Sequence, residues 1–196
     1  MRPSLCYWLD PIQSEIVNDP NPYQIIVGPA STGKTILIQL KVCQILLKGE
    51  NAAVLIILPL EILKVKYIQF FDTWGITEVE KLFIMTVRED WKTVMLVHKP
   101  HVFIDELSAV ESIDNNFLNK VLQLSKANEE IDKLIWLTFD YLQSFDILKL
   151  GLPQIKDKQF VERASKSHLL LVHRCTKKVF QVSSLPFKSN INYLLE

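Results

Sequence analysis

The stretch Gly28-Pro29-Ala30-Ser31-Thr32-Gly33-Lys34-Thr35 has the spacing G-x-x-x-x-G-K-[ST] of a phosphate-binding loop, and its setting decides the fold. The apolar run 25–27 leads into it and predicts a buried strand, and residues 36–48 predict a helix. Gly28 and Gly33 allow backbone conformations that are closed to residues with a Cβ, so consecutive N–H groups can turn inward around a phosphate. The helix amino terminus adds free donors and partial positive charge. The stretch therefore predicts a strand, a phosphate loop and a helix in succession.

Each residue of this stretch has an expected part in nucleotide binding. The ammonium of Lys34 would reach the β- and γ-phosphates, and the Thr35 hydroxyl would sit on Mg²⁺. The loop that surrounds the phosphates would consist of Gly28, Pro29, Ala30, Ser31, Thr32 and Gly33. The expected cofactors are ATP and Mg²⁺.

The composition predicts one large domain with a real core. The chain has 196 residues, of which 48% are hydrophobic. Its 22 basic residues balance 22 acidic ones, so global charge favours no particular partner. The distribution is uneven, because residues 72–132 are acidic overall and residues 154–188 are basic overall. The basic stretch could face a nucleic-acid backbone, although solvated surface charge is the favoured interpretation.

The cysteines and the hydropathy pattern predict a soluble, intracellular protein of the cytoplasm or nucleus, with no membrane partner. Cys6, Cys43 and Cys175 are widely spaced and form no C-x-x-C pair, which favours a reducing compartment and idle or buried thiols. The amino terminus lacks the apolar core of a secretory signal. The longest apolar run, residues 52–60, is half of what a membrane span needs.

Short apolar runs alternate with longer periodic segments along the chain, which predicts an α/β domain with a mainly parallel sheet and helices on both faces. No linker marks a domain boundary, and residues 151–167 are expected to form a long loop. The helix after the phosphate loop is apolar except for a narrow polar stripe, so we expect it in the interior. The predicted strands are 24–27, 53–58, 82–87, 101–104 and 134–139, and the predicted helices are 12–17, 34–48, 61–71, 89–97 and 113–125.

A second apolar strand, residues 101–104, ends in Asp105 and Glu106. The carboxyl ends of parallel strands meet at the edge where the phosphate loop also lies. Asp105 would hold Mg²⁺ directly or through water, and Glu106 would orient and deprotonate an attacking water. Such a pair favours a hydrolase over a small-molecule kinase, which can work without a base beside the metal ligand.

Two polar residues further along could sense the γ-phosphate. The strand that ends near Phe139 is followed by Gln143, whose amide can donate to a phosphate and accept from water. Arg174 precedes a short amphipathic segment, and arginine suits multidentate phosphate contact. Taken singly, an ordinary strand-end loop and an ordinary surface arginine are the favoured interpretations.

The order of these motifs resembles the first RecA-like domain of superfamily 1 helicases, and most closely the helicase-like C-terminal region of the schlafen family. Residues 9–13, Leu-Asp-Pro-Ile-Gln, look like the adenine-reading glutamine motif, and residues 53–61 occupy the place of a motif that touches single-stranded nucleic acid. Residues 103–106 match the Mg²⁺ and hydrolysis motif. Residues 136–143 with 151–153 are the most schlafen-like part, and residues 173–179 are similar to the arginine motif.

The resemblance covers residues 9–182 and implies a RecA-like P-loop NTPase domain with Walker A and Walker B motifs. It implies that Gln13 reads adenine, that Gln143 couples nucleotide state to the grip on single-stranded DNA or RNA, and that Arg174 stabilises the transferring phosphate. A second RecA-like domain does not follow within the 196 residues, so we expect feeble ATP hydrolysis unless one acts in trans. The alternative is a catalytically weak or inert nucleotide-gated scaffold of schlafen type.

Overall fold

The fold is organised by a parallel β-sheet whose strands follow the apolar runs of the sequence. The computed structural model describes residues 9–48, 53–76, 80–114, 116–126, 133–140, 155 and 157–169. Within these ranges six strands pair in the order β3-β2-β4-β5-β1-β6, and every pairing is parallel. The predicted parallel sheet is confirmed, with the five predicted strands each within one residue of their expected bounds. The strands are β1 (Tyr23–Val27), β2 (Val54–Leu58), β3 (Leu82–Thr86), β4 (His101–Ile104), β5 (Ile135–Phe139) and β6 (Ser165–His168).

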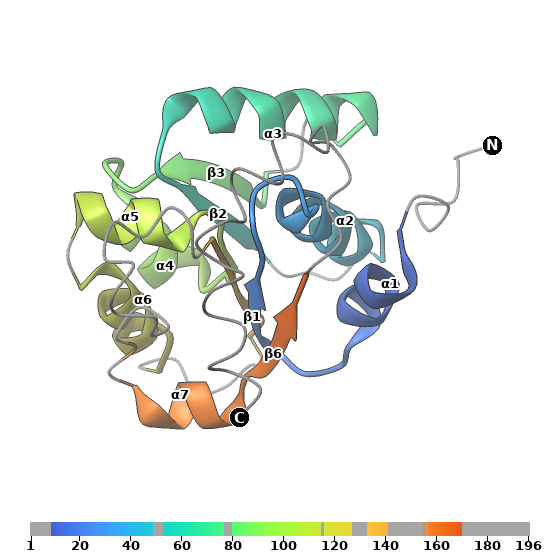
Figure 1. The fold of residues 1–196 in the computed structure, drawn as a ribbon. Helices are drawn as coiled ribbons and strands as arrows, with labels where there is room; N and C mark the ends of the chain where they lie inside the picture. Colours follow the sequence, from blue (N-terminus) through green and yellow to red (C-terminus); the bar gives the residue numbers. More distant parts are fainter. Residues whose placement is uncertain are drawn as a thin grey trace.

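Helices cover both faces of the sheet, so the described part of the chain has three layers (Figure 1). Successive side chains of a strand point to opposite faces, and each face therefore has its own apolar core. On β1, Ile26 belongs to one core, and Ile25 and Val27 belong to the other. The first core is covered by α1 (Pro11–Asn18), α2 (Lys34–Leu47) and α3 (Glu61–Thr73), and the second by α4 (Trp91–His98), α5 (Leu107–Ile113), α6 (Phe117–Lys126) and α7 (Lys158–Arg163).

Helix α2 lies in the interior, as its nearly continuous apolar sequence predicts. Leu37, Ile38 and Val42 are fully buried, whereas the side chains of the polar stripe keep some exposure. Cys43 is buried on the same helix, and burial raises the pKa of its thiol to about 12, so this cysteine is an unreactive core residue. Cys6 and Cys175 lie outside the described residues. Of the described helices, α2 included, none is long and apolar enough to cross a membrane.

The helix predicted over 113–125 is confirmed as α6, but its predicted start is wrong, because α5 ends at Ile113 and α6 begins at Phe117. Asp114 has extended backbone angles, and Asn116 has a left-handed φ of 75°, so the helical path is broken between the two segments. Asparagine tolerates the left-handed conformation better than most residues other than glycine, because its short side chain can hydrogen-bond locally. The Glu111 carboxylate accepts hydrogen bonds from the N–H groups of Asn116 and Leu118, which fixes the corner.

The long loop predicted over 151–167 is wrong, because α7 lies within it and β6 begins within it. Asp157 caps α7 by accepting from the Phe160 N–H at 3.1 Å, and Phe160 is buried. Strand β6 has the sequence Ser-Lys-Ser-His and is held beside β1 by backbone pairing. The prediction failed because β6 carries no apolar run that could mark it as a strand.

Candidate functional site

The phosphate loop connects the carboxyl end of β1 to the amino end of α2. Ser31 and Gly33 both have left-handed backbone, with φ values of 66° and 90°. Left-handed residues alternating with right-handed ones turn successive N–H groups toward one side, which makes an anion-binding concavity. Gly33 is the N-cap of α2 and provides no side-chain cap. The first turn of this 14-residue helix therefore keeps N–H donors for a ligand.

Both glycines of the loop stand where a Cβ would collide. A Cβ on Gly28 would lie 2.7 Å from the Leu169 carbonyl oxygen, which is backbone and cannot move freely. A Cβ on Gly33 would lie 2.5 Å from Nε2 of Gln13, at a residue whose φ already disfavours side chains. The spacing of the two glycines thus has a steric reason at each position.

Lys34 folds back over the loop. Its ammonium donates to the carbonyl oxygens of Gly28 at 2.7 Å and Pro29 at 2.9 Å, and its residue is only 4% exposed. The Asp140 Oδ2 atom lies 3.9 Å from the same nitrogen. An ammonium has three N–H donors, so closing the loop with two of them leaves one for a phosphate.

Asp105 lies opposite the loop at the carboxyl end of β4 and is fully buried. Its Oδ2 atom accepts hydrogen bonds from the Thr35 hydroxyl at 2.8 Å and from the Tyr67 phenol at 2.9 Å. Its Oδ1 atom accepts from the Thr138 hydroxyl. Burial and the neighbouring Asp105 charge raise the pKa of Tyr67 well above its usual value, so the phenol stays a donor. The two residues predicted to share a metal, Thr35 and Asp105, are therefore in direct contact.

Glu106 is strained and incompletely paired. It is the N-cap of α5 with a left-handed φ of 58°, a conformation that is uncommon for a residue with a long side chain. Among the described residues, its buried Oε2 atom has no hydrogen-bond partner. Burial, and then the charges of Asp105 and Asp140, raise the pKa of Glu106 from 4.5 to about 7, against the opposing charge of Lys34. Strain and an unpaired buried carboxyl group are typical of functional sites.

Gln13 lies beside the loop, where its side chain braces the backbone. Its Nε2 atom donates to the Thr32 carbonyl at 3.0 Å, and its Oε1 atom accepts from the Asp10 N–H. The Asp10 carboxylate in turn accepts from the Gln13 N–H, which completes a capping box at the start of α1. The residue is only 3% exposed. The predicted adenine contact of Gln13 stays a prediction.

The structure brings together Lys34, Thr35, Asp105 and Glu106 at one edge of the sheet, which we call the carboxyl edge. The predicted residues Gln143 and Arg174 lie outside the described residues. Sequence reasoning assigned no role to Tyr67, Thr138 or Asp140. The last two are polar residues at the end of an apolar strand, which is a usable signal, whereas a tyrosine on α3 is indistinguishable from a core residue.

The donors at the carboxyl edge fit a magnesium ion that is bound together with phosphates. In the described part of the chain, no group of three or more His, Cys, Asp or Glu side chains could hold a metal alone. Magnesium usually takes one or two protein oxygens and completes its octahedron with phosphates and water. Thr35 and Asp105 supply that kind of oxygen, beside a loop shaped for phosphates.

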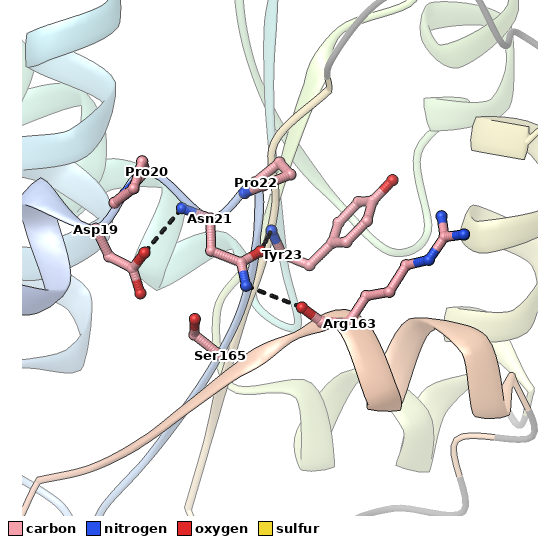
Figure 2. Close-up of a pocket in the computed structure, with 7 residues that line it drawn as sticks. All are labelled: Asp19, Pro20, Asn21, Pro22, Tyr23, Arg163 and Ser165. Atoms are coloured by element: carbon pink, nitrogen blue, oxygen red, sulfur yellow. Dashed lines mark hydrogen bonds between the residues drawn. The ribbon is translucent and has the colours of Figure 1, made fainter.

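A separate hollow of about 620 Å³ lies at the opposite edge of the sheet, where β1 and β6 begin (Figure 2). The hydrogen bonds of Asn21 connect residues that line the hollow. Its backbone N–H donates to the Asp19 carboxylate at 2.8 Å, and its side-chain amide donates to the Arg163 carbonyl at 2.9 Å. The Tyr23 N–H donates back to the Asn21 side chain at 2.9 Å. The polar groups drawn there thus join α1, β1 and α7, and we call this region the amino-edge clasp. The hollow is lined by Asp19, Pro20, Asn21, Pro22, Tyr23, Arg163 and Ser165.

Comparison with known proteins identifies the fold. No protein-family model matches the sequence, and no curated protein sequence matches it. The large terminase of a thermophilic bacteriophage superposes with a TM-score of 0.58 and 11% identity, over 89% of this chain and 49% of the terminase. The chain thus spans about half the length of that protein. Domain III of the Thermotoga maritima replication initiation protein DnaA has a TM-score of 0.48 and 13% identity, over 94% of this chain and 72% of that domain. Together with the parallel sheet and its two helical layers, the terminase likeness gives this chain the three-layer RecA-like fold of P-loop NTPases.

Proposed function

We propose that this chain is a helicase-type NTPase domain that binds Mg·ATP at the carboxyl edge. The observation that carries the proposal is the hydrogen bond between Thr35 and Asp105, beside Lys34 and Glu106, whose buried Oε2 atom has no hydrogen-bond partner among the described residues. Residues 70 positions apart meet there in the arrangement that a metal–triphosphate complex needs.

Phosphate binding falls to the loop and the first turn of α2. The loop N–H groups and the free donors of α2 would donate to the phosphate oxygens, and Lys34 would add its remaining N–H and its charge. Thr35 and Asp105 would hold Mg²⁺, which neutralises charge on the β- and γ-phosphate oxygens when bound.

Hydrolysis would depend on Glu106. A base works best when its pKa lies near the working pH, and the Glu106 pKa of about 7 meets that condition. Glu106 would accept a proton from the attacking water and aim that water at the γ-phosphate. Gln143 and Arg174 are proposed to sense and stabilise the transferring group.

The binding claim is tested by isothermal titration of Mg·ATP against the wild-type chain and the Lys34→Ala variant. We expect the variant to bind at least about 100-fold more weakly, because a charge-assisted phosphate contact contributes about 1.5–3 kcal/mol and the loop also loses its internal tie. The matched control is Lys41→Ala, about two turns further along the same helix, whose ammonium donates to the Val17 carbonyl at 2.9 Å. Equal affinity of wild type and Lys34→Ala would overturn the proposal.

The proposed partners are single-stranded DNA or RNA and a second RecA-like domain acting in trans. Phosphate contacts make nucleic-acid affinity fall steeply with salt. We expect salt-dependent binding of a single-stranded oligonucleotide that changes when Mg·ATP is added. Tight nucleotide binding without measurable hydrolysis, even with an oligonucleotide present, would favour the nucleotide-gated scaffold of schlafen type instead.

A further inference from the structure

Tyr67 reaches the carboxyl edge from helix α3, one of the helices that cover the sheet. The residue is fully buried, and its ring lies 6.2 Å from the ring of Phe71 between centroids. Its hydroxyl donates to Asp105 Oδ2 at 2.9 Å. A buried phenol in an apolar layer needs a partner, and this one has the carboxylate that the proposed metal site requires.

The hydrogen bonds determine which lone pairs of the Asp105 carboxylate remain available to a metal ion. Each carboxylate oxygen has about two lone-pair sites. On Oδ2, both are used by Thr35 and Tyr67, and on Oδ1 one is used by Thr138. A cation could bind Oδ2 directly only by displacing a hydroxyl.

The same bonds orient the Thr35 hydroxyl. Because its hydrogen points to Asp105, its oxygen lone pairs are turned away from the carboxylate and are available to a ligand. The carboxylate thus fixes the orientation of the Thr35 hydroxyl, as long as Oδ2 itself stays in place.

We propose that Tyr67 is a positioning residue that keeps Asp105 Oδ2 in place as the acceptor of the Thr35 hydroxyl, so that the Thr35 oxygen, and not Oδ2, faces the ion. The inference rests on the Mg·ATP site proposed above. It predicts a metal preference, because Mg²⁺ gives up its waters reluctantly and needs octahedral geometry, whereas Ca²⁺ readily takes direct and irregular carboxylate contacts. A free Oδ2 would favour Ca²⁺.

The test measures ATP affinity in EDTA, Mg²⁺ and Ca²⁺ for the full chain and for Tyr67→Phe, which keeps the ring and removes only the hydroxyl. We expect the Mg²⁺-to-Ca²⁺ affinity ratio to fall about fivefold in the variant, with the EDTA affinity unchanged within about twofold. The matched control is Tyr23→Phe, whose ring packs on Phe160 at 5.4 Å on the opposite core, and its ratio should equal that of the wild type.

The outcomes separate this inference from the proposed function. If the wild type binds ATP more tightly with Mg²⁺ and Tyr67→Phe keeps the wild-type ratio, the role of Tyr67 is overturned and the function stands. If the wild type binds no ATP, both fall. Because each ratio is taken within one variant, a modest loss of stability cancels.

A second measurement covers the case in which Tyr67→Phe fails to fold. 3-Fluorotyrosine is placed at position 67 alone, and its ¹⁹F resonance is followed while Mg²⁺ is added to the ATP-saturated chain. We expect the resonance to move, and the same label at position 23 to stay. A stationary signal at position 67 would contradict the proposed role.

Discussion

The pKa of a carboxyl group is shifted in opposite directions at the two edges of the sheet. At the carboxyl edge, burial and neighbouring charges raise the pKa of Glu106, and a buried oxygen is left unpaired among the described residues. At the amino-edge clasp, burial acts against Asp19 as well, but hydrogen bonds from Asn21, Gln24 and Ser165 outweigh it and lower the pKa. At the carboxyl edge the charge of Glu106 lowers the stability of the fold. At the amino-edge clasp the charge of Asp19 stabilises the contacts between α1, β1 and α7. A hollow lies at the amino-edge clasp, so volume alone does not mark the proposed functional end, and the pairing of polar groups is the better guide.

The comparison is tested most strongly by changing each carboxyl group to an amide and measuring ATP hydrolysis. We expect Glu106→Gln to lower kcat by about 10²–10⁴-fold with ATP affinity retained, because only a general base is lost. Asp19→Asn should leave kcat unchanged. Steady-state phosphate release measures both, and equal rates for wild type and Glu106→Gln would remove the distinction between the edges.

We expect Glu106→Gln, which lowers activity, to raise the free energy of unfolding. The pKa of Glu106 is raised on folding, so folding favours its protonated form and stability is lost as pH rises from 4.5 through about 7. The glutamine variant has no such loss. Urea unfolding should therefore find Glu106→Gln more stable than wild type at pH 8, by at most about 3 kcal/mol, with the difference gone below pH 4.5.

Titrating groups that do not interact with Glu106 leave this result unchanged. Glu89 and Asp157, whose pKa values are lowered, contribute equally to wild type and variant and cancel in the difference. A glutamine variant that is less stable than wild type at pH 8 would show that the Glu106 charge is well paired in solution.

The smallest expected effect is at the clasp. Asp19→Asn keeps an oxygen that can accept from the Asn21 N–H and removes only the charge. The pKa of Asp19 is lowered on folding, so its charge stabilises the fold at pH values above the ordinary pKa of this carboxyl group. This stability is lost as the pH falls through the pKa of the folded state. Because the group is partly exposed and solvent screens its charge, we expect a loss under about 0.5 kcal/mol at pH 8 by the same unfolding measurement. A gain in stability would make the two edges alike.

The sequence predicts the carboxyl edge well because its parts carry local signals. The glycine spacing from Gly28 to Gly33 and the apolar run before Asp105 each have a pattern that does not depend on distant contacts. The contact of Thr35 with Asp105 then follows from the rule that parallel strands end at one edge.

Other features depend on tertiary contacts that no local pattern encodes. Strand β6 is polar and forms because β1 offers an unpaired edge to its backbone. The Tyr67 hydroxyl meets Asp105 because of the place that position 67 takes on α3. The residue type alone does not indicate this contact. The break after Ile113 depends on the extended Asp114 and the left-handed Asn116, which a periodicity analysis counts as ordinary polar residues.

The double use of Gln13 has a consequence for local unfolding. The same side chain completes the cap of α1 and bonds to the loop carbonyl of Thr32, so the first turn of α1 cannot fray without releasing the loop. In native-state hydrogen exchange, the amides of α1 and those of the loop should share one opening free energy. A ligand that closes the loop would then slow exchange throughout α1, beyond any residue that it contacts.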